Sequence, residues 1–461
     1  MAPAATTEKK KKAMVPAATT EKKKKTMAPA ATTGKKKKAM APAAQEDWFI
    51  MYAIPKISDD MSKEFPNASF TFNEALLLSH LTLASNVATP AGNVDYPYIA
   101  ATDDFGLLLL CGYTFVGLTY YICDPYFRGT LGILPPDGGF NCRHSVGLIR
   151  RRRGSWFMVA QLNTGLFSTE GRVTLSCTID LCRWVKKETD CSHIKVKKRC
   201  CWDGVLSHEG FLWWFDLSCS SCILACNPFK HRPPVYQIMF PQVDHPLLSE
   251  WFPVQGDKYR CLKVSKGRLQ YVQIHGDPPP PPPPVVSMWT LSSNNPPDAG
   301  WDHKLDVHLT DIWSHHTYKS SMLPDIVPTV ALVHPMNAHK VYFFLGQHIF
   351  CVNLKTKRVR QCLELNNQEL PGLSSLMVHS WNLPAGATKI HFSGPDESRV
   401  PGAHFLAQYD SVDGFLEKAL AVLSRSSLEY FAMGLDVLEE DEDHSVTMDE
   451  SDDGDLRDRV T

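Results

Sequence analysis

Cysteines are the residues of this sequence whose spacing comes nearest to a metal site. Cys219 and Cys222 are separated by two residues and Cys226 follows, whereas the upstream Cys200 and Cys201 are adjacent. Zinc needs four ligands that converge tetrahedrally, and two pairs of C-x2-C spacing are the usual source. The adjacent pair, and the predicted strand between Cys222 and Cys226, favour buried or edge-strand thiols. Zinc binding and a redox pair are the alternatives.

Histidines and aspartates form a second group between residues 302 and 316. Its members are Asp302, His303, Asp306, His308, Asp311, His315 and His316. Imidazole and carboxylate groups are ligands of several transition metals. Because the spacing matches no ligand motif, surface and helix-capping roles are favoured over a metal site.

Sequence motifs of catalysis are missing from the chain. It contains no G-x-S-x-G nucleophile elbow, no Walker loop and no G-x-G-x-x-G phosphate loop. We therefore expect no catalytic residues, no cofactor, no metal and no enzyme activity. One modification site is a candidate, because Arg152-Arg153-Gly154-Ser155 matches the pattern of basophilic kinases and makes Ser155 a possible phosphosite. The alternative is a solvated hairpin tip.

A basic N-terminal segment opens the chain with an internal repeat of 13 residues. The phrase MAPAATTEKKKKA opens at Met1, it recurs as MVPAATTEKKKKT from Met14 and as MAPAATTGKKKKA from Met27, and a truncated fourth copy begins at Met40. Its lysines are candidates for nuclear import or phosphate contact; they are Lys9, Lys10, Lys11, Lys12, Lys22, Lys23, Lys24, Lys25, Lys35, Lys36, Lys37 and Lys38. The alternative is a tandem duplication without a role.

Opposite charges at the two ends cancel one another, and the chain of 461 residues has a net charge of −1. Residues 1–44 carry 12 Lys and two Glu, whereas residues 436–461 carry 12 acidic residues and two Arg. Such blocks repel themselves and bury no apolar surface, so disorder is predicted for residues 1–45 and 436–461. The body between them is close to neutral, and we expect no basic stripe on it.

The body, residues 46–395, is rich in short strands separated by turns. Runs such as Trp48–Ile54, Trp156–Leu162 and Phe211–Phe215 combine β-branched and aromatic residues over five to eight positions. Val341–Leu345 opens a three-stranded meander. Many antiparallel strands at intervals of about 8–12 residues, in a segment too long for one sandwich, predict an all-β, propeller-like array.

Helix and proline patterns interrupt the strands in three places. Residues 311–318 are predicted to form a short helix, and a small helical segment is predicted over residues 396–435 from the apolar period that begins at Leu416. Pro278–Pro284 is a run of seven prolines, which predicts an exposed polyproline II segment between two strands. It is either an expanded hairpin loop or a ligand for an aromatic groove.

An ordered series of segments resembles the plant proteins with domain of unknown function 1618 (DUF1618), which are numerous in cereal grasses. The resemblance begins at Trp202-Asp-Gly-Val-Leu-Ser-His-Glu-Gly-Phe-Leu-Trp-Trp-Phe-Asp216, continues through Lys258–Lys263 and Met288–Leu291, and ends with Leu332-Val-His-Pro335 and Val341–Leu345. It assigns a DUF1618 region to about residues 202–345. The Trp-rich strands are more distantly similar to F-box-associated β-propellers, which bind proteins.

This resemblance implies a non-enzymatic protein–protein interaction module, with the partner left open. The alternative is a nucleic-acid-associated nuclear protein that the lysine repeats recruit, through weak and non-specific contacts. The chain has no run of 18 apolar residues and no apolar signal core after its first lysines. We therefore expect an intracellular protein of the nucleus or cytoplasm, neither secreted nor bound to a membrane.

Overall fold

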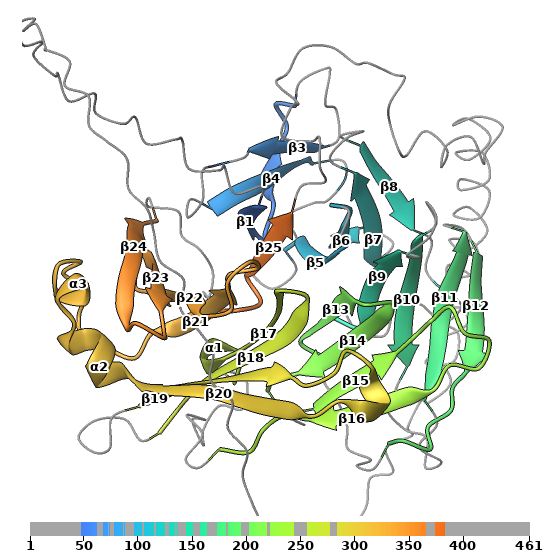
Figure 1. The fold of residues 1–461 in the computed structure, drawn as a ribbon. Helices are drawn as coiled ribbons and strands as arrows, with labels where there is room; N and C mark the ends of the chain where they lie inside the picture. Colours follow the sequence, from blue (N-terminus) through green and yellow to red (C-terminus); the bar gives the residue numbers. More distant parts are fainter. Residues whose placement is uncertain are drawn as a thin grey trace, which may run out of the picture. The chain divides into compact units, whose positions relative to one another are not determined.

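The structure is a computed structural model of the whole chain (Figure 1). It describes residues 48–61, 68–71, 73, 78–85, 87, 96–103, 106–114, 117–124, 129–133, 136, 144–150, 157–163, 173–180, 183–194, 202–218, 222–243, 256–276, 284–365 and 374–382. The expectations for residues 1–45, Ser155, Pro278–Pro283, 396–435 and 436–461 lie outside these residues.

Five antiparallel blades of four strands each follow one another along the chain. The first two are β5 (Tyr98–Thr102), β6 (Leu108–Thr114), β7 (Gly117–Asp124), β8 (Gly129–Ile133) and β9 (Val146–Arg150), β10 (Phe157–Asn163), β11 (Thr174–Asp180), β12 (Arg183–Glu188). The third is β13 (Gly204–His208), β14 (Phe211–Asp216), β15 (Cys222–Cys226), β16 (Val235–Met239).

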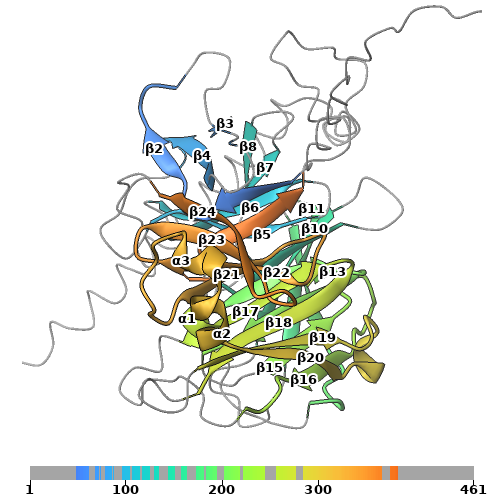
Figure 2. The same cartoon turned by 60° about the vertical axis from the view of Figure 1, so that its left-hand side comes forward.

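The fourth and fifth blades repeat the same order. They are β17 (Arg260–Ser265), β18 (Arg268–His275), β19 (Val285–Leu291), β20 (Trp301–His308) and β21 (Thr329–Val333), β22 (Lys340–Leu345), β23 (His348–Asn353), β24 (Arg358–Glu364). Figure 2 shows β17 to β20 side by side in sequence order. The predicted meander is confirmed as β22–β23–β24.

A sixth, mixed sheet joins the two ends of the described chain. It contains β1 (Trp48–Tyr52), β2 (Lys56–Ser58), β3 (Ala68–Thr71), β4 (Leu78–Ala84) and β25 (Val378–Asn382). β25 pairs antiparallel with β1, from Trp48 opposite Asn382 to Tyr52 opposite Val378. Figure 1 shows the orange β25 beside the blue β1. Sequentially remote strands thus share one sheet, which closes the array.

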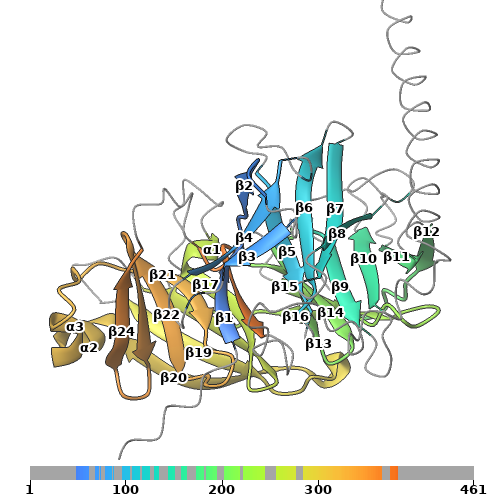
Figure 3. The same cartoon turned by 90° about the horizontal axis from the view of Figure 1, so that it is seen from above.

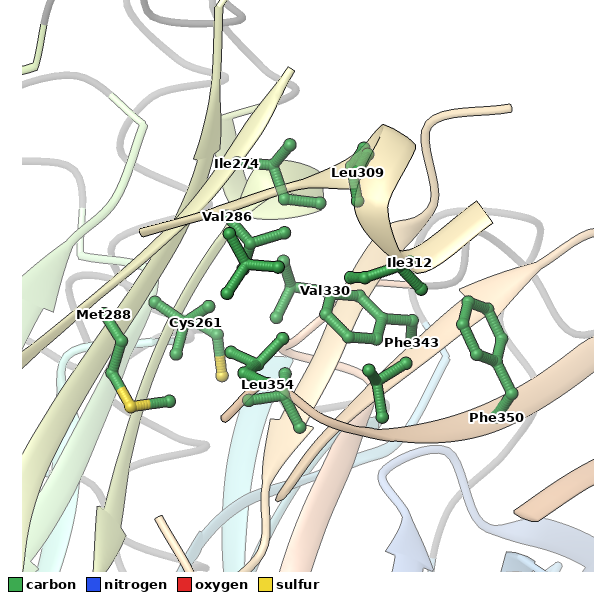
Figure 4. Packing of buried hydrophobic residues seen from close by; sticks show 14 of the residues in the cluster. Cys261, Ile274, Val286, Met288, Leu309, Ile312, Val330, Phe343, Phe350 and Leu354 are labelled. Atoms are coloured by element: carbon green, nitrogen blue, oxygen red, sulfur yellow. The ribbon is translucent and has the colours of Figure 1, made fainter. Parts of the chain in front are cut away.

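Six apolar clusters fill the spaces between consecutive sheets. Each cluster takes its buried residues from two sheets, and together they run from the closing sheet through all five blades and back to the closing sheet. Figure 4 shows one of them, in which Cys261 and Val286 of the fourth blade pack against Phe343 and Phe350 of the fifth. Burial on both faces explains why the strands are apolar on both sides. The predicted all-β, propeller-like fold is confirmed.

β14 shows how one strand serves two clusters. Trp213 and Phe215 pack toward the fourth blade, whereas Leu212 and Trp214 pack toward the second. Both indoles are fully buried, and their Nε1–H groups donate to the carbonyl oxygens of His208 (3.1 Å) and Ser145 (2.7 Å). This is the alternation that a β-strand imposes on adjacent side chains.

Short helices interrupt the strand pattern around the fourth blade. α1 (Gly256–Tyr259) and the 3-10 helix η2 (Pro296–Asp298) are single turns. α2 (Leu309–Ser314) and α3 (His316–Lys319) follow β20, where one short helix was predicted. Figure 3 shows both beside β24. Within the described residues, no helix has the length and apolar character that a membrane span requires.

Candidate functional site

Neither group of potential metal ligands converges within the described residues. Cys222 and Cys226 lie at opposite ends of β15, four residues apart. At about 3.3 Å per residue they are separated by roughly 13 Å, too far for two thiolates that must each lie about 2.3 Å from one zinc ion. Across the described part of the chain, no three His, Cys, Asp or Glu side chains are grouped as a metal site requires.

The histidine–aspartate group is spread over β20 and the two helices after it. His303 Nε2 contacts Asp306 Oδ1 at 2.8 Å, and Lys304 Nζ contacts Asp302 Oδ2 at 3.3 Å. His315 caps α3 by accepting from the Thr317 backbone N–H. These are the surface and capping roles that the spacing favours.

A serine, a histidine and an aspartate do meet on the fourth blade, in an order that does not suit nucleophilic catalysis. Ser287 Oγ donates to Asp306 Oδ1 at 2.5 Å and lies 2.7 Å from His275 Nε2. In a catalytic triad the histidine takes the serine proton and the carboxylate orients the histidine. Here the Ser287 hydroxyl donates its hydrogen bond to the carboxylate, so its oxygen accepts from His275 Nε2. The arrangement links three neighbouring strands.

Polar side chains also tie the first strands of the blades to the closing sheet. Lys263 Nζ on β17 donates to the carbonyl oxygen of Val378 at 2.8 Å. His379 Nε2 on β25 donates to the carbonyl oxygen of Ile99 on β5 at 2.9 Å. Burial, together with the charge of Lys263, lowers the pKa of His379 to about 3, against an opposing effect of the bond to Ile99. His379 is therefore neutral at physiological pH, and these groups hold β25 in place.

A cavity of about 50 Å³ lies between the third and fourth blades. It is lined by Phe240, Pro241, Gln242, Val243, Arg260, Tyr271 and Gln273. Arg260 Nη1 donates to the carbonyl oxygen of Leu217 at 2.6 Å, and the Tyr271 hydroxyl donates to Gln273 Oε1 at 2.9 Å. Substrate pockets are several times larger, and this volume suits one or two water molecules.

The clearest candidate for a binding surface is the segment that follows α3, which we call the Met322 loop (residues 320–328). Met322 is 90% exposed and Ile326 is 58% exposed, although both are large apolar side chains. Met322 also has a φ of 54°, in the left-handed region that favours glycine. An exposed methionine therefore occupies a position where a glycine would relieve backbone strain.

Buried neighbours hold the Met322 loop in this shape. Leu323 is buried in the cluster between the fourth and fifth blades. The Tyr318 hydroxyl donates to the carbonyl oxygen of Pro324 at 2.6 Å, and the Ile326 backbone N–H bonds to the same oxygen at 2.8 Å. Burial, and to a lesser extent Asp325, raises the pKa of Tyr318, so this donor keeps its proton. The loop is a fixed support for two outward-facing apolar side chains.

The helices before the loop are fixed as well. Lys357 Nζ, in the turn before β24, contacts Asp311 Oδ2 of α2 at 2.7 Å. The Val359 backbone N–H of β24 donates to Thr317 Oγ1 of α3 at 2.9 Å. α2 and α3 are thereby attached to the fifth blade, as Figure 1 shows. The sequence predicted the helix but gave no signal for the exposed pair, because exposure depends on what packs nearby.

The closed series of sheets defines the chain as a β-propeller protein. Residues 214–342 match the model of the family described as "Protein of unknown function (DUF1618)". The chain therefore carries a DUF1618 region, as the sequence resemblance predicted, and the region contains the Met322 loop. No curated protein matches the chain.

Solved structures with distant similarity include one that is described as a β-propeller domain. The β-propeller domain of Cps50 (Swd1) from Myceliophthora thermophila is 11% identical, with a TM-score of 0.32, over 64% of this chain and 97% of that chain. TolB from Acinetobacter baumannii is 10% identical, with a TM-score of 0.32, over 68% and 65%. Similarity this low leaves the fold assignment to the sheet pattern described above.

Proposed function

We propose that this protein is a non-enzymatic protein–protein interaction module that presents the Met322 loop to a protein partner. The observation that carries the proposal is a strained backbone at an exposed methionine. Left-handed backbone costs a non-glycine residue about 1–2 kcal/mol. A 90% exposed methionine placed there at this cost is better explained by what the side chain contacts outside the chain.

The chemistry of the loop suits a protein partner. Methionine is flexible and polarisable and adapts to irregular apolar surfaces. Met322 and Ile326 lie four residues apart on a loop that is already ordered, so little conformational entropy is lost on binding. Lys319 and Asp325 are exposed nearby and supply a polar rim around the apolar pair.

Two further features support the non-enzymatic part of the proposal. The Ser287 hydroxyl donates to a carboxylate, which is the wrong direction for an activated nucleophile. The cavity beside Arg260 is too small for a substrate. An intracellular location is proposed with it, because Cys177, Cys226 and Cys261 are buried free thiols, a state that a reducing compartment maintains.

Affinity capture with matched surface variants tests the proposal. The double variant Met322→Glu, Ile326→Glu places two charges on the loop, and the control Met336→Glu changes another methionine that is 67% exposed. We expect the parent and the control to capture the same proteins from the source tissue, and the double variant to lose at least one of them. A photo-crosslinking residue at position 322 then identifies the direct contact.

Equal capture by all three proteins would overturn the proposal. All these positions are exposed, so the thermal unfolding of the variants should stay close to that of the parent. Thermal unfolding thereby distinguishes a variant that loses capture because it unfolds from a folded variant that has lost the contact with its partner.

A further inference from the structure

A cluster of cations lies on the second and third blades, where a neutral surface without a basic stripe was expected. It comprises Arg183 and Lys187, which share one face of β12, and Lys230 and Arg232 of the turn between β15 and β16. We call these four residues the basic patch. The expectation was wrong because net charge averages over the body, whereas folding brings residues some 40 positions apart together.

Backbone and side-chain bonds hold the two halves of the basic patch against each other. Lys187 Nζ donates to the carbonyl oxygens of Pro228 (2.7 Å) and Lys230 (3.1 Å). The Asp190 N–H donates to the carbonyl oxygen of Pro233 at 3.0 Å, and the Val235 N–H donates back to that of Asp190 at 2.9 Å. Adjacent blades therefore present one continuous surface here.

Local acidic groups only partly neutralise this surface. Glu188 and Asp190 are the two carboxylates of the same segments, against the four cations of the basic patch. Hydrogen bonds from Ser192, followed by the nearby His193 and Arg232, lower the pKa of Asp190, so its charge persists. Three of the four cations are exposed, and Lys187 is half-buried.

Aromatic side chains lie within the same surface. The rings of His193 and Tyr236 are 4.8 Å apart and tilted by 31°, and His193 is exposed. A flat, exposed ring beside a row of cations offers a stacking surface for a nucleobase and charge for the phosphates on either side of it.

We propose that the basic patch binds single-stranded nucleic acid without sequence preference, with Arg183, Lys230 and Arg232 on phosphates and His193 against a base. The site is separate from the lysine repeats at the chain's N-terminus. A membrane surface is the less suitable ligand, because the large apolar side chain exposed on β12 is Val185, at only 37%, whereas the more exposed Met322, Met336 and Ile326 belong to other loops. Insertion into a bilayer needs a larger apolar face next to the cations.

Salt-dependent binding of a fluorescent 20-nucleotide RNA to the full chain tests the inference. The triple variant Arg183→Gln, Lys230→Gln, Arg232→Gln removes three phosphate contacts and leaves Lys187, which has a structural role, unchanged. Each contact contributes about 0.7 to the slope of log K against log salt for single strands, so we expect the slope to fall by about 2. Affinity at 0.1 M salt should fall by about 10- to 100-fold.

The control is Lys355→Gln, Arg358→Gln, Arg360→Gln, which makes the same charge change at the exposed edge of β24. Both triple variants are also measured in a second background, in which the 12 lysines of the N-terminal repeats are changed to Gln. RNA binding by the repeats then does not contribute to the measured affinity. We expect the patch variant to lose affinity in both backgrounds and the control to lose little. His193→Ala should weaken the binding of RNA more than that of a strand without bases.

Three results would overturn the inference. One is an equal loss of affinity in the patch and control variants. Another is the absence of any RNA binding once the lysines of the repeats are removed. The third is binding of phosphatidylserine vesicles, lost in the patch variant, by a protein that does not bind the RNA.

Discussion

Replacement of Met322 by glycine is expected to stabilise the protein. The left-handed backbone at φ 54° costs a side-chain-bearing residue about 1–2 kcal/mol, and glycine removes that cost. Glycine also gives the unfolded chain more freedom, which costs about 0.5–1 kcal/mol. The methionine is 90% exposed, so little burial energy is lost with it. The balance is a gain of about 0.5–1 kcal/mol in the free energy of unfolding.

Met336→Gly is the matched control for this prediction. Met336 is 67% exposed and is not among the described residues with positive φ, so its replacement adds unfolded-state entropy without relieving strain. We expect this variant to lose about 0.5–1 kcal/mol. Urea unfolding at a constant m-value measures both, and the difference of about 1–2 kcal/mol isolates the backbone term.

The same variant links stability to binding. If the Met322 side chain contacts a partner, Met322→Gly should unfold at higher urea and capture less of that partner. If Met322→Gly is destabilised as much as Met336→Gly, the backbone there is not strained, and the argument for a retained binding residue fails. If Met322→Gly is more stable than the parent but captures the same amount of partner, the backbone is strained there and the Met322 side chain does not contact the partner.

Other predictions concern the core and the closing sheet. Trp213→Ala and Trp214→Ala should each cost about 3–5 kcal/mol in unfolding experiments, because each empties a different cluster between blades; two variants as stable as the parent would contradict the assignment of β14 to a central strand. Gly147→Ala should be destabilising in the same assay, because its Cβ would lie 2.6 Å from Val205 Cγ1 in the contact between the second and third blades; parental stability would show that the blades yield there. Lowering the pH from 7 to 4 should reduce the free energy of unfolding, because His379 takes up a proton below about pH 6.5 in the unfolded chain and only near pH 3 in the folded chain. In a series of urea midpoints, His379→Gln should make this free energy depend less on pH. The same pH dependence in the variant and the parent would exclude His379 as its source.

Central strands of the blades were predictable from the sequence because both of their faces are buried. Phe211–Phe215 and Val341–Leu345 are apolar at nearly every position, and the structure places them in β14 and β22 between two clusters. The hydrophobic pattern of such a strand reports its own environment. β25 was not predicted, because its place in the fold depends on pairing with β1, more than 300 residues away.

Two outer strands of the blades, β12 and β20, were missed for the opposite reason. β12 (RWVKKE) and β20 (WDHKLDVH) are largely exposed and lack apolar alternation. Charge on such strands prevents edge-to-edge pairing with another chain, so charge alone is no argument for a ligand. The histidine–aspartate group of β20 illustrates this, since its charges pair with one another within the strand.

What separates β12 from β20 is where its charge continues. On β20, Asp302 and Asp306 alternate with Lys304 and His303, and the positive and negative groups are in contact. On β12 the cations are extended by Lys230 and Arg232 from the next blade, held there by bonds from Lys187 to the backbone. Protection of an edge requires charge on that strand alone and gives no reason for a neighbouring blade to add more of the same sign. The accumulation across two blades, beside an exposed ring, is therefore the property that indicates a polyanionic ligand.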